Sequence, residues 1–165
     1  MKNYNKFVGL DVHKAEISVA IANGDRGKAG YYGTVENTSY ACLKLAKKLS
    51  KGGEQALFCY EAGPCGHEIY RQLKKAGYDC VVIAPSLIPK KAGDRVKTDR
   101  RDAVSLARLM RAAKLTSIWV PDREQETMRD MTREREDMKG IERNSRQRLG
   151  GFLLRHGKIY PGKPE

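Results

Sequence analysis

Four acidic residues occupy positions where a carboxylate can take part in chemistry. Asp11 lies within an apolar run, where a charge is costly unless it is paired or bound to a metal ion. Glu61 directly follows a second apolar run. Asp99 and Asp102 are three residues apart at the start of a predicted helix, so they share one face. Acids in a first helical turn also stabilise the helix dipole, which is the alternative interpretation of this pair.

Together the four acids predict a metal-dependent catalytic site. Four carboxylates that converge cannot all stay ionised without cations. Two divalent cations, about 3.5–4 Å apart, would stabilise the attacking and leaving oxygens of a phosphoryl transfer. Mg²⁺ prefers carboxylate oxygens, water and substrate phosphates as ligands, and Mn²⁺ is the expected substitute. The expected catalytic residues and the expected metal ligands are the same four: Asp11, Glu61, Asp99 and Asp102.

Basic residues accompany these acids. They can hold the phosphates of a nucleic-acid strand, although a solvated loop or helix face has the same composition. His13 and His67 also lie near the acids, and a structural or surface role is favoured for both because Mg²⁺ sites seldom use imidazole. The candidate nucleic-acid contacts are Lys14, Lys90, Lys91, Arg95, Lys97, Arg100, Arg101, Arg143, Arg146 and Arg148.

The composition favours a polyanionic partner. The 165 residues include 32 Lys and Arg against 20 Asp and Glu, a net charge of +12 that points to nucleic acid above all. No apolar segment approaches the roughly 20 residues of a membrane helix, and the N-terminus lacks the apolar core of a signal peptide. The four cysteines form no Cys-x-x-Cys pair, which argues against zinc and indicates buried thiols in a reducing cytoplasm.

The spacing of apolar residues predicts the elements that must position these side chains. An antiparallel meander of three strands comes first, and helices and strands then alternate: strands Lys6–Val12, Glu16–Ala22 and Gly30–Glu36, helix Ser39–Lys51, strand Ala56–Tyr60, helix Cys65–Ala76 and strand Asp79–Ala84. After a basic loop at Pro89–Lys97 come helix Asp99–Ala113, an extended segment at Ser117–Val120 and a long charged helix from Asp122 to about Arg148. This order predicts an α/β, RNase H-like mixed sheet with flanking helices.

Four strings of residues resemble one family. They are Gly9–Lys14 (GLDVHK), Tyr60–Gly66 (YEAGPCG), Lys97–Ala103 (KTDRRDA) and Ile118–Pro121 (IWVP). In this order they are similar to the N-terminal domain of the DEDD transposases encoded by the insertion sequence 110 and 1111 group. The acidic letters of the family motif fall on Asp11, Glu61, Asp99 and Asp102.

The resemblance implies a RuvC-like catalytic domain with Mg²⁺-dependent action on DNA, in the bacterial or archaeal cytoplasm at the nucleoid. It also implies site-specific recombination by an oligomer, guided by a structured RNA from the element's non-coding end. Members of the family continue into a second domain, whose serine is thought to be the DNA nucleophile. Because this chain ends at Glu165, we expect an excised domain or a truncated copy.

The main hypothesis is the N-terminal part of a transposase that mobilises an insertion sequence by Mg²⁺-dependent DNA cleavage and strand transfer. Residues 1–121 would form the RuvC-like catalytic domain, and residues 122–165 a long helix and basic tail. The helix at 122–148 would mediate homo-oligomer assembly or bind nucleic acid. Two alternatives stay open: a stand-alone structure-specific nuclease that cuts with a metal-bound water, and a catalytically incomplete fragment that binds nucleic acid.

Overall fold

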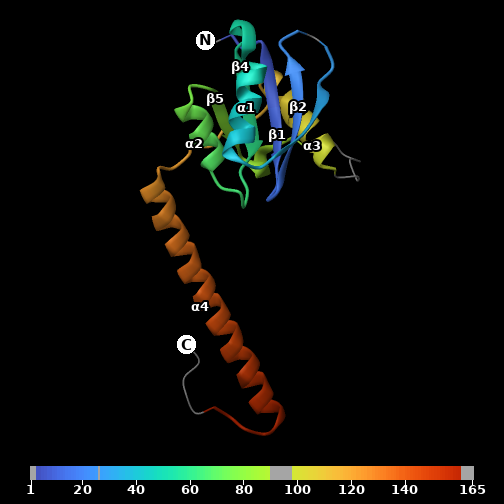
Figure 1. Cartoon of the computed structure of the whole chain (residues 1–165). Coiled ribbons are helices and arrows are strands. Elements are labelled where there is room, and N and C mark those ends of the chain that lie inside the picture. The colour runs from blue at the N-terminus through green and yellow to red at the C-terminus, as the bar shows by residue number, and fades with distance from the viewer. Residues whose placement is uncertain (1–2, 26, 90–97, 161–165) are drawn as a thin grey trace. The chain divides into compact units, whose positions relative to one another are not determined.

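The structure, a computed structural model, describes residues 3–25, 27–89 and 98–160. The chain divides into two compact units, residues 1–120 and 121–165. A five-stranded sheet with the order β3-β2-β1-β4-β5 forms the centre of the first unit (Figure 1). Its elements are β1 (Lys6–Val12), β2 (Glu16–Asn23), β3 (Gly30–Glu36), α1 (Ser39–Leu49), η1 (Lys51–Gly53), β4 (Ala56–Glu61), α2 (Glu68–Lys75), β5 (Asp79–Ile83), η2 (Pro85–Leu87) and α3 (Asp99–Arg111).

The central strand of the sheet is β1. It pairs antiparallel with β2 and parallel with β4, while β3 and β5 form the two edges. The first three strands are therefore the predicted antiparallel meander, and the last two are added in parallel after helical crossovers. This mixed sheet with flanking helices confirms the predicted RNase H-like fold class.

Successive residues of β1 face opposite layers of the fold, as the pleat of a strand requires. Val8 and Leu10 are buried in the larger core, together with Leu45 of α1 and Leu73 of α2. The opposite face of the sheet is covered by α3, whose buried Ala103 and Ala107 pack with small side chains of β2. Figure 1 shows α1 and α3 on opposite sides of the sheet.

Gly9 lets α3 approach the backbone of β1 closely. A Cβ atom at this position would lie 2.3 Å from the carbonyl oxygen of Ala103 and 2.6 Å from the amide nitrogen of Ala107. Such distances leave no room for a side chain. Asp11, two residues further along the strand, is on the same face as Gly9 and is therefore directed to the side of the sheet that α3 covers.

Two predicted boundaries differ by more than two residues from those observed. The helix predicted from Cys65 begins at Glu68, because the preceding residues form a turn in which the Gly66 amide donates to the Gly63 carbonyl at 3.0 Å. Gly66 adopts a φ of 65°, in the left-handed region that glycine tolerates.

The long charged helix extends further than predicted, as α4 (Arg123–Arg155) in the second unit. Gly150 and Gly151 do not end it, since an interior glycine costs only about 1 kcal/mol. The helix ends in a Schellman motif at Gly157, where the amides of Gly157 and Lys158 donate to the carbonyls of Leu154 (3.0 Å) and Leu153 (2.9 Å). None of the described helices combines the length and the apolar composition that crossing a membrane requires.

Candidate metal centre

Asp11 occupies the next-to-last position of β1, opposite Ser18 of β2. Its side chain is 19% exposed, and the Oδ2 atom is buried from solvent. Because the central strand carries this carboxylate toward α3, the negative charge lies in a partly desolvated position where a nearby cation stabilises it.

His13 lies between two carboxylates. Its Nδ1 atom is 3.7 Å from Asp11 Oδ2, and its Nε2 atom is 3.7 Å from Asp99 Oδ1. Backbone hydrogen bonds hold the turn that carries the ring: the His13 amide donates to the Glu16 carbonyl at 2.9 Å, and the Asn37 side-chain amide donates to the His13 carbonyl at 2.8 Å. The imidazole ring therefore lies between the two carboxylates, where it would contact a group that both of them bind.

Asp99 is the first residue of α3, and the start of that helix is fixed locally. Thr98 caps it by accepting a hydrogen bond from the Arg101 amide at 3.3 Å. The close packing of α3 at Gly9 fixes the same helix against the central strand. Packing and capping together therefore bring Asp99, distant in sequence, to the end of β1.

The three side chains offer ligand atoms that all lie within 4.8 Å of one another. Two ligands on opposite sides of Mg²⁺, at 2.0–2.1 Å each, are about 4.2 Å apart. The two 3.7 Å separations involve different nitrogens of the His13 ring, so only one of them can join donors to the same ion. Two carboxylates and an imidazole form a plausible donor set for a divalent cation, and the chemistry of this group suggests a divalent metal site.

The two other predicted acids lie outside this group. Leu10 pairs with Tyr60, so Asp11 and Glu61 come next on neighbouring parallel strands. Glu61 is exposed at the end of β4. Asp102 follows Asp99 within the first turn of α3 and is partly buried. Among the described residues, the tight group contains Asp11 and Asp99 of the four acids, and His13 in addition.

The predicted phosphate contacts fall in three places. Arg100 and Arg101 are exposed at the start of α3, and Lys14 is exposed in the turn after β1. In the second unit, Arg146 on α4 forms an ion pair with Glu142 at 2.7 Å. Arg143 and Arg148 are exposed on the same helix, whereas Lys90, Lys91, Arg95 and Lys97 lie outside the described residues.

His13 is the residue that the sequence analysis did not place in the site. A signal for it was present, because residues two apart on a strand share a face, and Asp11 and His13 have that spacing. The general preference of Mg²⁺ for oxygen ligands outweighed this signal. His67, considered in the same way, does not belong to the described group.

Comparisons with known proteins agree with the resemblance of the motifs. The model of the DEDD transposase family of the insertion sequence 110 type, described as "Transposase", matches residues 8–157. The chain is 49% identical over 158 residues to the putative transposase y4qE of Sinorhizobium fredii, covering 95% of this chain and 40% of that protein. It is 37% identical over 150 residues to the transposase for insertion sequence element IS1533 of Leptospira borgpetersenii, covering 90% and 43%.

Two solved structures are also similar. One is the T. thermophilus RuvC in complex with a Holliday junction substrate, at 9% identity and a TM-score of 0.45, covering 70% of this chain and 100% of that one. The other is the large terminase nuclease from the thermophilic phage G20c, at 17% identity and a TM-score of 0.37, covering 68% and 57%. The chain spans about two-fifths of the length of the curated relatives it matches. From the family match over nearly its whole length, the chain belongs to the DEDD transposases of the insertion sequence 110 family.

Proposed function

We propose that this chain is the N-terminal, metal-dependent catalytic part of a DNA transposase, which mobilises an insertion sequence by strand cleavage and transfer. The observation that carries the proposal is that Asp11, His13 and Asp99 lie together at the C-terminal end of the central strand of an RNase H-like sheet. Residues 1–121 form the catalytic domain in this proposal, and residues 122–165 provide a long helix and a basic tail.

Asp11, Glu61, Asp99 and Asp102 are the proposed catalytic acids and the ligands of Mg²⁺, or of Mn²⁺ in its place. The adjacency of Asp11 and Glu61 on parallel strands supports this assignment, as does the single helical turn that carries Asp99 and Asp102. When bound, the divalent ions supply Lewis-acid stabilisation of the oxygens at the scissile phosphate. His13 lies between the two nearest carboxylates, 3.7 Å from each, and Arg100 and Arg101 contact flanking phosphates.

The proposed partners are DNA, a guide RNA from the same element and further copies of this chain. Assembly through the helix at 122–148 is supported by exposed apolar side chains along α4, among them Met128, Met131, Met138 and Ile141, each 59–65% exposed. Aligned apolar side chains on a helix surface favour contact with another helix. The proposed location is the cytoplasm of a bacterium or archaeon, at the nucleoid.

A stand-alone nuclease is the second candidate function. The observation that favours it is that all four proposed catalytic acids lie within the first unit, between residues 11 and 102. Such an enzyme would attack the phosphate with water held by the same acids, so it would release cut DNA and join no strands.

The test is Mg²⁺-dependent cleavage of branched and linear DNA by the full chain, with Mn²⁺ binding measured by calorimetry. We expect Asp11→Asn and Asp99→Asn each to lower the cleavage rate by about a hundredfold or more and to weaken Mn²⁺ binding, because each removes a charged ligand. The matched control is Asp79→Asn. This residue pairs with Lys74 at 3.3 Å at the opposite end of the sheet, so both readouts should be retained.

The outcomes separate the candidates. Joined strands among the products support the transposase, and cutting alone supports the nuclease. DNA binding with no cleavage at any metal concentration would identify a fragment that binds without catalysis. If Asp11→Asn and Asp99→Asn left Mn²⁺ binding unchanged, the acids would not be metal ligands and the proposal would be wrong.

A further inference from the structure

A basic groove lies between α3 and the connection from β2 to β3, within the first unit. Its volume is ≈ 650 Å³, which is larger than a single bound ion requires. Eleven residues line it, among them Lys28, Tyr31, Arg100, Arg101, Arg108 and Arg111. Five of these are basic and none is acidic, so the groove has the electrostatic character of a site for an extended anion.

Arg111 builds one end of the groove. Its guanidinium Nη1 donates to the carbonyl oxygens of Asn23 (3.0 Å), Asp25 (2.9 Å) and Gly27 (2.6 Å). The Gly27 amide in turn donates to Asp25 Oδ1 at 3.0 Å. These contacts fasten the β2–β3 connection to the C-terminal end of α3, and Lys28 follows immediately on that connection. The groove is therefore formed by the fold itself, before any ligand is present.

Tyr31 forms a wall of the groove near its other end. The Arg100 guanidinium lies 5.1 Å from the centre of the Tyr31 ring, a cation–π distance, and the Tyr31 hydroxyl is 2.6 Å from Thr34 Oγ1. The ring and its hydroxyl contact orient Arg100 without neutralising it. An oriented guanidinium is well suited to bind a phosphate with two hydrogen bonds.

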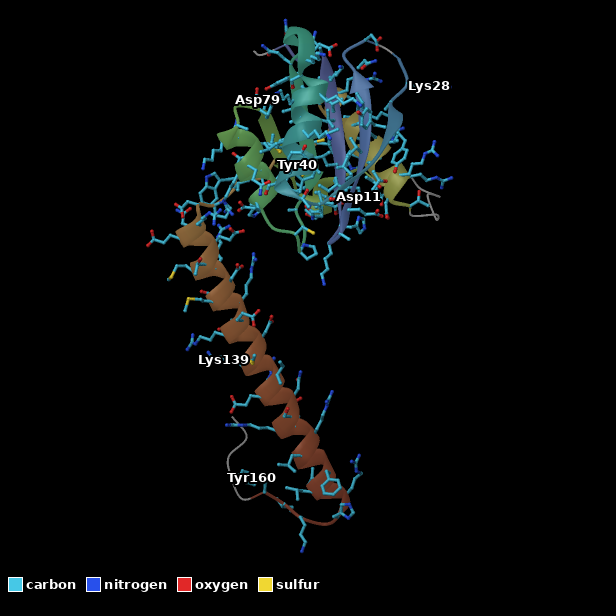
Figure 2. The ribbon with its side chains drawn as sticks, viewed as in Figure 1. Asp11, Lys28, Tyr40, Asp79, Lys139 and Tyr160 are labelled. Carbon is cyan, nitrogen blue, oxygen red and sulfur yellow. The ribbon has the colours of Figure 1, made fainter. Side chains whose placement is uncertain are left out.

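The basic side chains follow one face of α3. Arg100, Arg108 and Arg111 recur at helical spacing, with Val104 between the first two, and from the first to the last the helix rises by about 16 Å. Measured along the axis of a duplex, this length corresponds to about five nucleotides of one strand, at a rise of 3.4 Å each. The row begins next to Asp99 of the candidate metal centre, and Figure 2 shows Lys28 on the part of the unit away from Asp11.

We propose that this groove binds the sugar-phosphate backbone of DNA and leads one strand toward the acidic group. Lys28 and Arg108 are the contacts that this inference adds to the site, while Arg111 acts as a positioning residue for the β2–β3 connection. The inference rests on the proposed function, since it specifies where the substrate lies relative to the same acids. A lining with five basic and no acidic residues, which begins beside the acidic group, suits a DNA strand that enters a metal-dependent site.

The test measures how DNA binding depends on salt. The double variant Lys28→Gln, Arg108→Gln removes two exposed charges of the groove. The control Lys47→Gln, Lys75→Gln removes two exposed lysines from α1 and α2, on the opposite face of the sheet. Fluorescence anisotropy with a labelled 20-base-pair duplex between 50 and 200 mM NaCl gives the slope of log K against log salt. Each lost phosphate contact should reduce the magnitude of that slope by about 0.9.

The expected result is a slope smaller by about 2 in the groove variant and unchanged in the control, together with weaker binding of every duplex sequence tested. Mn²⁺ binding should be the same in both, because neither variant alters a carboxylate. An unchanged slope in the groove variant, together with normal cleavage by the parent chain, would contradict DNA binding by the groove. The proposed function would not be affected. If the slope of the groove variant changed with an RNA duplex and not with DNA, the proposal would also be wrong, because the groove would then bind RNA.

Discussion

The two charged helices of the molecule, α3 and α4, differ in what fixes them. In α3, four side chains are buried: Ala103, Leu106, Ala107 and Leu109. In α4, none of the described residues is buried along 33 residues. The same kinds of charged residue therefore have different consequences. Those on α3 are held at defined places relative to the sheet, whereas those on α4 define a surface along a helix.

Different forces stabilise the two helices. Packing against β1 and β2 holds α3, so tertiary contacts with the sheet provide most of the stability of this helix. In α4, the stabilising features are local: a capping box in which Asp122 and Gln125 bond reciprocally, the Glu142–Arg146 pair and the terminal Schellman motif. Such terms are worth roughly 0.3–1 kcal/mol each. The comparison implies that one kind of substitution will have opposite effects in the two regions.

The largest expected effect comes from a glycine in each region. Gly9→Ala should destabilise the first unit by about 1–3 kcal/mol, because the added methyl group overlaps the backbone of α3 and forces that helix outward. Gly140→Ala should instead stabilise α4 by about 1 kcal/mol, since nothing lies within 4 Å of the added atom and alanine is the better helix former. Urea unfolding and helicity by circular dichroism measure the two changes. Effects of the same sign would remove the distinction between the helices.

A pH dependence is expected from the buried thiols of the first unit. Burial raises the pKa of Cys59 to about 12, and burial, followed by the nearby Cys59, raises the pKa of Cys80. Above the ordinary value of 9.0, the unfolded chain loses these protons while the native state keeps them. The free energy of unfolding should therefore fall as the pH rises above 9, by about 1.4 kcal/mol per pH unit for each thiol.

The measurement is the free energy of unfolding at pH 8 and pH 10, in the parent chain and in Cys59→Ala. The variant is less stable at both values because it leaves a cavity, but its loss between them should be smaller. All four cysteines precede residue 81, so α4 contributes no thiol to the difference. A loss of the same size in parent and variant would show that Cys59 does not carry the effect.

The order of elements could be predicted from the sequence because each depends on local spacing. The apolar run around Asp11 and the cap at Thr98 each depend on a few neighbouring residues, and the fold places Asp11 close to Asp99. The end of α4 was not predicted, because two glycines inside a helix look like a stop signal until the Schellman motif at Gly157 is seen.

The groove could not be predicted for a different reason. Lys28 and Arg108 are 80 residues apart, and only the packing of α3 across β1 and β2 places them on one surface. Likewise, His13 looked structural because its ligand-like position depends on where Asp99 arrives. Long-range placement of this kind depends on tertiary contacts, which no local pattern of residue types encodes.

The smallest expected effect compares the caps of the two helices. Thr98→Ala and Asp122→Ala each remove a side-chain hydrogen bond to a backbone amide, at 3.3 Å and 2.8 Å, and each should cost about 1 kcal/mol. Their effects on metal binding should nevertheless differ. Loosening the first turn of α3 displaces Asp99, the residue after Thr98, so Mn²⁺ should bind more weakly to Thr98→Ala. Calorimetry should find the parent affinity in Asp122→Ala, whose helix carries none of the proposed ligands. Equal losses of affinity in the two variants would mean that metal binding follows overall stability and that the placement of Asp99 by α3 is not what matters.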